Sequence, residues 1–115
     1  MFKLYKNRTF ITINPKEKFI EIIRKYIPNI DPDHIHTKRI YSFDDQLVES
    51  KEDLIELLKK NYKQIILREI DFFVDHDIDM DKSFENFLSC FGFEIIELGF
   101  DCSETNIEFI DSEDL

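Results

Sequence analysis

The chain has 115 residues, a length typical of one domain that buries a hydrophobic core without metal or disulfide support. Its formal net charge is −10 at pH 7, which disfavours direct binding to nucleic acid or to an anionic membrane, because both carry negative charge. Apolar residues make up 43% of the chain, so wholesale disorder is excluded. We therefore expect residues 1–115 to form a single acidic domain.

The N-terminal part predicts a strand followed by a helix. The run from Phe10 to Ile13 is short, β-branched and aromatic, which favours a strand. Asn14 is placed to cap a helix whose first residue is Pro15, and apolar residues then recur at helical spacing as far as Pro28. We expect one amphipathic helix over this stretch.

A second strand and a second helix follow. Residues 38–43 have the composition of a strand. Ser50, with Asp53 three residues later, forms a near-capping box that predicts a helix beginning at Lys51.

Two patterns compete over residues 64–74. A continued helical stripe has one miss, at Glu69, whereas a strand beginning near residue 64 has one miss, at Arg68. No Gly or Pro separates this segment from the helix before it. We favour a helix to about Val74 and retain a strand as the alternative.

The C-terminal part predicts a helix and a β-hairpin. Asp81 can cap a helix over residues 82–91, and Gly92 stands just past its end. Residues 93–100 and 106–110 are β-rich runs joined by a loop of about five residues. The expected fold class is α+β: a small antiparallel sheet packed against about three helices, with a C-terminal β-hairpin.

Charge is divided unevenly along the chain. From Met1 to Arg68 there are 14 Lys or Arg against 10 Asp or Glu, whereas from Glu69 to Leu115 there is one Lys against 15 acids. An anionic field of this kind attracts basic protein surfaces, such as the phosphate-binding clefts of nucleases. The expected partner is a basic protein, with no small-molecule substrate.

Two stretches contain acids without basic neighbours in the sequence, residues 71–81 and 101–114. Loops and sheet edges should keep these acids exposed, and one or two of the interleaved aromatic residues could anchor an interface. The candidate partner-binding residues are Asp71, Asp75, Asp77, Asp79, Asp81, Asp101, Glu104, Asp111, Glu113 and Asp114.

The run from Asp75 to Asp81 is similar to the start of an EF-hand loop, because its carboxylates alternate. However, Met80 stands where that loop needs Gly, and Asn86 stands where it needs a bidentate Glu. We predict no calcium site and no cofactor.

Other chemistry has weak support. His34 and His36 have the spacing of two ligands on one strand face, and His76 could complete a metal site only if the fold brought it close. Neither Cys90 nor Cys102 stands beside Lys, Arg or His, where a thiol becomes reactive. We predict no metal site, no catalytic residue and no enzymatic activity.

The expected location is the cytoplasm. Two cysteines are too few for a disulfide framework. The first eight residues alternate basic and apolar side chains, so a signal peptide is not expected, and no run approaches the roughly 18 apolar residues that span a bilayer.

Small size, excess acid and the lack of a catalytic motif together predict a stoichiometric inhibitor. We expect it to block a basic partner, in the manner of an immunity protein that neutralises a nuclease toxin. One alternative is a phage-type nucleic-acid mimic that inhibits a DNA- or RNA-binding defence complex. The second is a metal-dependent hydrolase that uses His34, His36 and the acids of residues 75–81.

Overall fold

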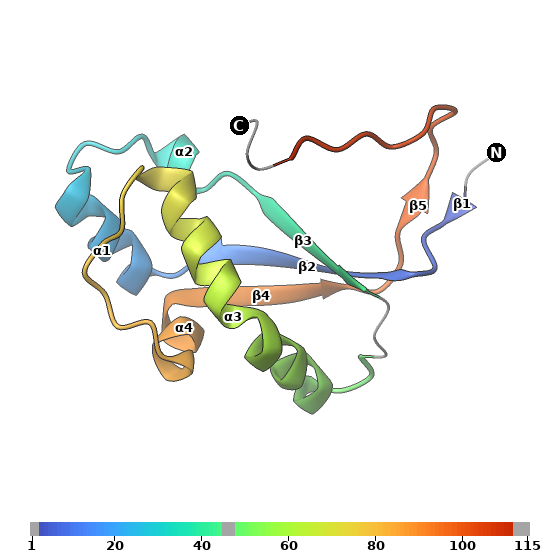
Figure 1. Cartoon of the computed structure of the whole chain (residues 1–115), viewed down its shortest axis with the longest axis horizontal. Coiled ribbons are helices and arrows are strands. Elements are labelled where there is room, and N and C mark those ends of the chain that lie inside the picture. Colours follow the sequence, from blue (N-terminus) through green and yellow to red (C-terminus); the bar gives the residue numbers. More distant parts are fainter. Residues whose placement is uncertain (1–2, 45–47, 112–115) are drawn as a thin grey trace.

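The structure is a computed structural model that describes residues 3–44 and 48–111 (Figure 1). These residues form four helices and five strands, an α+β fold as the sequence predicts. The elements in chain order are β1 (Lys3–Leu4), β2 (Arg8–Pro15), α1 (Glu17–Tyr26), α2 (Pro32–Ile35), β3 (Arg39–Asp44), α3 (Lys51–Phe73), α4 (Phe84–Cys90), β4 (Phe91–Ile96) and β5 (Phe100–Asp101).

The three-stranded sheet has β2 at its centre, with β3 and β4 antiparallel on either side. Ile11 of β2 lies opposite Tyr41 of β3 and Ile95 of β4. Beyond this sheet, β1 and β5 form a two-stranded antiparallel pair, and the Tyr5 N–H donates to the Gly99 carbonyl at 2.9 Å. The N-terminal chain is therefore paired with the segment from β4 to β5 over most of its length.

The helices pack on one face of the three-stranded sheet. Side chains alternate along β2: Ile11 and Ile13 are buried, whereas Phe10 and Thr12 point to the other face and are partly exposed. Figure 1 shows α3 crossing in front of the three strands, with α1 and α4 at the end opposite β1 and β5. The large rings at the centre of the core are Phe19, Phe87 and Phe91.

Helix α3 confirms two predictions from the sequence. The Ser50 hydroxyl accepts from the Asp53 N–H at 3.1 Å, which is one arm of a capping box, and the Asp53 carboxylate reaches back to accept from the N–H of Glu49, the residue before the cap, at 3.1 Å. The helix then continues without a break through residues 64–73, which decides the ambiguous segment in favour of a helix. Ile66 and Ile70 from that segment are buried in the core.

The predicted ends of two helices are wrong. Asn14 and Pro15 belong to β2 and pair with Gly92 and Phe91, so neither begins a helix. The residue that precedes α1 is Lys16, which makes no side-chain cap hydrogen bond. Gly92 likewise lies inside β4, and no glycine in the described chain has positive φ, so it does not end α4 as a left-handed residue. Strand pairing prevails here over local capping signals.

Helix α4 is shorter than predicted and begins later. Its cap is Ser83, whose hydroxyl accepts from the Asn86 N–H at 3.2 Å. Asp81, the predicted cap, does not cap the helix itself. Its carboxylate accepts from the Ser83 N–H at 2.9 Å and thereby holds the capping residue in place.

The C-terminal β-hairpin region consists of β4 followed by β5, but its predicted bounds are wrong. Residues 106–110 are not in a strand, and the chain turns between Ile96 and Phe100 rather than after it. The partner of β5 is β1. Pairing with a strand distant in sequence cannot be predicted from local composition. Residues 106–110, predicted as the second strand of the hairpin, pair with no strand in the described part of the chain.

Candidate functional site

The two acidic stretches lie apart in the molecule. The loop of residues 74–83, which joins α3 to α4, runs beside α1, whereas the second stretch begins at β5, at the far end, and runs back above β3 toward the middle of the molecule (Figure 1). The longest dimension of the chain is 47 Å. Asp71 is exposed on the last turn of α3 and belongs with the loop. The fold therefore does not bring the candidate residues into one patch.

The acidic residues of the loop 75–81 make ion-pair and hydrogen-bond contacts within the protein. Asp77 forms an ion pair with Lys82 at 3.2 Å, and this hydrogen bond, with one from the Ile78 N–H, holds the pKa of the Asp77 carboxyl below its usual range. The Asp79 N–H donates to the Tyr26 hydroxyl at 2.7 Å. These contacts give the loop a structural role besides any role in binding.

Basic side chains of α1 also lie next to this loop. An open hollow of about 410 Å³ is lined by Lys18 and Lys25 from α1 and by Asp79 and Asp81 from the loop. In sequence these acids have only one basic neighbour, Lys82, but in space they face lysines from the N-terminal half. Part of the anionic field is cancelled here.

Acids at the other end are less compensated. Asp101 is paired in register with Lys3; two hydrogen bonds from Ser103 and then the charge of Lys3 keep the pKa of the Asp101 carboxyl low. Glu104 and Asp111 are exposed, and the sequence has no Lys or Arg after Lys82. Glu113 and Asp114 lie outside the described residues.

Large apolar side chains are exposed beside these C-terminal acids. Ile107 is 62% exposed, Phe109 is 82% exposed and Ile110 is 72% exposed. Together, residues 101–111 present carboxylates and apolar groups on the same segment, which we call the C-terminal segment. The sequence analysis expected one or two aromatic residues of the acidic stretches to anchor an interface, but it placed Ile107 and Ile110 in a strand and did not anticipate their exposure.

A buried charge cluster was missed by the sequence reasoning. Arg39 of β3 donates to both carboxylate oxygens of Glu69 at 2.6 to 3.0 Å, and the Tyr41 hydroxyl donates to the same carboxylate at 2.6 Å. Glu69 is fully buried, and the Arg39 guanidinium lies over the rings of Phe72 and Phe73 at 5.0 and 5.4 Å. Burial and the neighbouring carboxylate raise the pKa of Tyr41 far above its ordinary value.

This cluster holds β3 against α3 and is closed to substrates, because the Glu69 side chain is 0% exposed. The signal that could have found it is the single charged residue in the apolar stripe of the helix. A Glu in that position needs a buried cation, and Arg39 is the partner that β3 supplies.

The residues considered for metal binding and catalysis are not assembled into a site. Within residues 3–44 and 48–111, no group of three or more His, Cys, Asp or Glu side chains could hold a metal ion. His34 stacks on Phe72 at 4.9 Å, and His76 lies 5.9 Å from the Tyr26 ring. Cys90 is buried, and this burial raises the pKa of its thiol, which disfavours the reactive thiolate.

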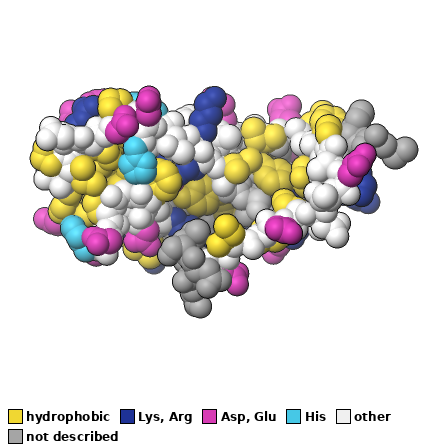
Figure 2. Space-filling view, turned by 90° about the horizontal axis from the view of Figure 1, so that it is seen from above, with side chains coloured by type: hydrophobic (Ala, Val, Ile, Leu, Met, Phe, Trp, Pro, Cys, Tyr) yellow, Lys and Arg dark blue, Asp and Glu magenta, His cyan; other side chains and the backbone are white. Residues whose placement is uncertain are grey.

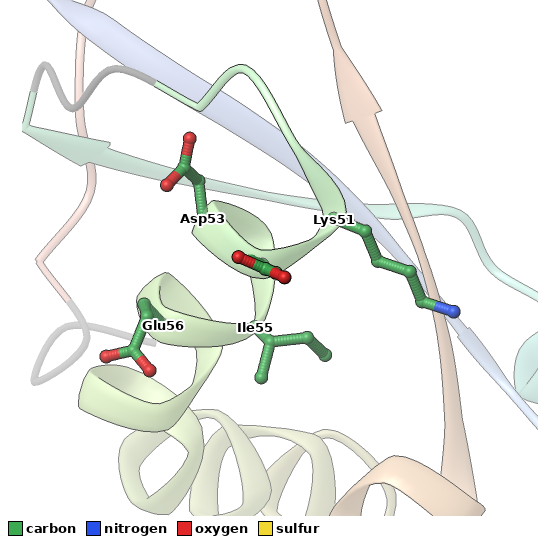
Figure 3. A pocket seen from close by; sticks show the side chains of 5 residues that line it. Lys51, Asp53, Ile55 and Glu56 are labelled. Atoms are coloured by element: carbon green, nitrogen blue, oxygen red, sulfur yellow. The ribbon is translucent and has the colours of Figure 1, made fainter.

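A hollow of about 650 Å³ lies beside the first two turns of α3 (Figure 3). Its lining includes Lys51, Asp53, Ile55 and Glu56, and Figure 3 shows Lys51 pointing away from the carboxylates of Asp53 and Glu56. Asp53 is already used by the helix cap. The lining side chains diverge, so they form no convergent set for catalysis.

Comparison of the chain with protein-family models, with curated proteins and with solved structures gives no match. Among the described residues, no helix combines the length and the apolar character needed to cross a membrane.

Proposed function

We propose that this chain is a stoichiometric inhibitor that binds a basic protein, in the manner of an immunity protein that neutralises a nuclease toxin. The observation that carries the proposal is the C-terminal segment, where uncompensated carboxylates and exposed apolar side chains occur together. Apolar groups that are buried on binding supply affinity, and surrounding charges supply rate and specificity. The proposal involves no catalysis by this chain.

Two further observations support an immunity-type surface over a nucleic-acid mimic. A mimic should space its carboxylates like phosphates along one ridge, whereas the two acidic stretches here are separate, one beside α1 and the other running from β5 back above β3 (Figure 1). Large apolar side chains such as Phe109 interrupt the C-terminal acids, which suits a compact mixed patch.

The proposal narrows the binding site to the C-terminal segment. Asp77 and Asp81 already make contacts within the chain, and Lys18 lies beside Asp81, so the loop contributes a weaker net field. We assign the main partner contacts to Glu104 and Asp111, because Asp101 is hydrogen-bonded by Ser103 and lies opposite Lys3. The site of action in this proposal is the cytoplasm, where Cys90 and Cys102 would remain reduced thiols.

The test uses the protein encoded by the neighbouring gene, because immunity proteins and their toxins are made together. Its nuclease activity should fall in proportion to added chain and reach zero at one equivalent. Inactivation by far less than one equivalent would indicate catalysis and contradict the proposal, as would full activity in the presence of excess chain.

A further inference from the structure

One face of the three-stranded sheet carries no described helix. The residues that alternate with the buried positions of β2 and its neighbours point to this face, among them Phe10, Ile40 and Ile96. Ile40 is 58% exposed and Ile96 is 36% exposed. Polar residues such as Thr12, Ser42 and Glu94 share this face, as is normal where a sheet meets water, and the three apolar residues form a local apolar patch on it.

A hollow of about 270 Å³ opens over these residues. It is lined by Phe10, Ile40 and Ile96 from the sheet, by Tyr5, which follows β1, and by Phe100 of β5. An apolar cavity of about 150 Å³ holds a benzene ring, so the hollow has room for an aromatic side chain. We call it the sheet groove.

Gly99 shapes one wall of the sheet groove. A Cβ at this position would lie 3.1 Å from the Tyr5 ring, which is tighter than ordinary van der Waals contact. Without that Cβ, the Tyr5 ring lies against the backbone and meets Phe10 edge-on, with centroids 5.3 Å apart. The groove is therefore built by close packing between β1, β2 and the turn before β5.

Exposed apolar residues are concentrated around this groove. Of the 12 large hydrophobic residues exposed in the described chain, nine belong to β1 and the residue after it, the bare sheet face, the turn to β5, β5 itself, and the C-terminal segment. Figure 2 shows hydrophobic side chains exposed in the half of the molecule that holds β1 and β5, and others at the opposite end. The nine are Leu4, Tyr5, Ile40, Ile96, Leu98, Phe100, Ile107, Phe109 and Ile110.

The area of this patch suits an interface. Most of the nine side chains are more than half exposed, so they present on the order of 800 Å² per copy. Stable interfaces bury about that area on each partner.

The C-terminal segment has the properties of a cover for the sheet groove. Ile107 already lies at the margin of the groove, but Phe109 and Ile110 remain 82% and 72% exposed in their own chain. Residues 106–110 also have the composition of a strand, yet they pair with no strand. A segment with strong β composition and no ladder is suited to exchange between copies.

The charges around groove and segment are complementary. Lys3 and Lys6 are exposed close in sequence to the groove residue Tyr5, whereas Arg8 is already paired with Asp44 at 4.0 Å. The segment carries Glu104, Glu108 and Asp111. Exposed pairs of this kind add little free energy, but they orient the segment, while apolar burial supplies the affinity.

We propose that two copies of this chain form a two-fold dimer in which the C-terminal segment of each copy lies in the sheet groove of the other, with Phe109 as the anchor. Segment and groove are on the same chain, so one two-fold axis satisfies both contacts at once. The dimer uses the same segment as the proposed partner contacts, so the dimer and the inhibitor complex compete for it. Because the dimer involves this chain alone, its test needs no partner, and its failure leaves the proposed function standing.

Sedimentation velocity on the full chain tests the dimer, at about 2 to 500 μM and at physiological ionic strength, where the Debye length of about 8 Å limits repulsion between the acidic copies. We expect a monomer–dimer equilibrium. Phe109→Asp, in the segment, and Ile40→Asp, in the groove, should each raise the dissociation constant at least tenfold. Leu67→Asp is the matched control, because Leu67 is 51% exposed on α3, away from the groove residues, and it should change the constant less than twofold.

An equimolar mixture of the two variants separates segment exchange from simple contact between two patches. The Ile40→Asp copy keeps an intact segment and the Phe109→Asp copy keeps an intact groove, so the mixture should associate more tightly than either variant alone. Circular dichroism checks the folding of each variant, and Ile40→Thr replaces Ile40→Asp where structure is lost. A monomeric wild type at the highest concentration, a dimer insensitive to both variants, or a mixture no tighter than its components overturns the proposal.

Discussion

The loop of residues 75–81 and the C-terminal segment are equally acidic in sequence, but their surroundings differ. Asp77 pairs with Lys82, the backbone of Asp79 is bound by Tyr26, and lysines of α1 face the loop. In the C-terminal segment, carboxylates and apolar side chains extend from the body together. Runs of acid in a sequence therefore keep their anionic field only where the fold leaves them without nearby cations.

Glu69 is the acid whose charge is most fully compensated, because it is buried against Arg39. Its replacement is expected to have the largest effect on stability. Glu69→Ala leaves the Arg39 guanidinium buried without its carboxylate, so the free energy of unfolding should fall by about 3–5 kcal/mol. Urea denaturation followed by circular dichroism measures this loss.

Glu108→Ala in the exposed C-terminal segment is the control, and it should change stability by less than about 0.5 kcal/mol. A loss below about 1 kcal/mol for Glu69→Ala would show that the buried pair is not a structural requirement.

A smaller effect is expected for Tyr41, which donates to the Glu69 carboxylate at 2.6 Å. Tyr41→Phe should cost about 1.5–3 kcal/mol near neutral pH, because it removes a hydrogen bond to a charged acceptor. The folded protein raises the pKa of Tyr41 above the unfolded value of about 10, so this contribution is fully present below pH 10 and is lost as pH rises above it.

Urea midpoints between pH 8 and pH 11 measure this dependence. The wild type should lose stability more steeply than Tyr41→Phe above pH 10, and Tyr5→Phe, which removes a hydroxyl outside the cluster, should follow the wild type. Identical slopes for the wild type and Tyr41→Phe would contradict the role of the buried phenol.

The smallest expected effect concerns the loop, where Lys82 compensates the charge of Asp77. The Lys82 hydrogen bond is the largest cause of the low pKa of Asp77, so Lys82→Met should raise that pKa toward the ordinary value of about 3.9. The contribution to stability is present above the unfolded pKa and is lost as pH falls through the folded one. Carbon-detected NMR titration of the carboxyl measures it, with Asp101 in the same sample as the unchanged control; an unaltered Asp77 would mean that Lys82 does not compensate the loop.

Local signals were sufficient for several elements of the fold. The Ser50 and Asp53 capping box and the uninterrupted apolar stripe predicted α3, and β-branched composition predicted β3. Caps and apolar stripes depend on residues within one or two turns of the chain. They therefore predict the folded structure correctly unless pairing with a strand distant in sequence overrides them. At Asn14 and Pro15 a distant strand does compete, because the ladder with β4 extends β2 past the expected helix start.

The candidate site was harder to predict than the fold, because the charges around an acid come from residues that are close in space but distant in sequence. The proximity of Lys18 to Asp81, and of Arg39 to Glu69, follows from packing between elements far apart in sequence. The bare sheet face was also hidden, since alternation along β2 shows that two faces exist but not which one the helices leave open.

The central hypothesis is that partner binding depends mainly on the C-terminal segment and only weakly on the loop of residues 75–81. Stopped-flow association with the protein encoded by the neighbouring gene tests it, using two triple charge reversals to Lys at matched ionic strength. Reversal at Glu104, Glu108 and Asp111 should slow association about tenfold or more, whereas reversal at Asp75, Asp77 and Asp79 should slow it less than about threefold. Equal slowing by both variants, or a larger effect from the loop, would contradict the account.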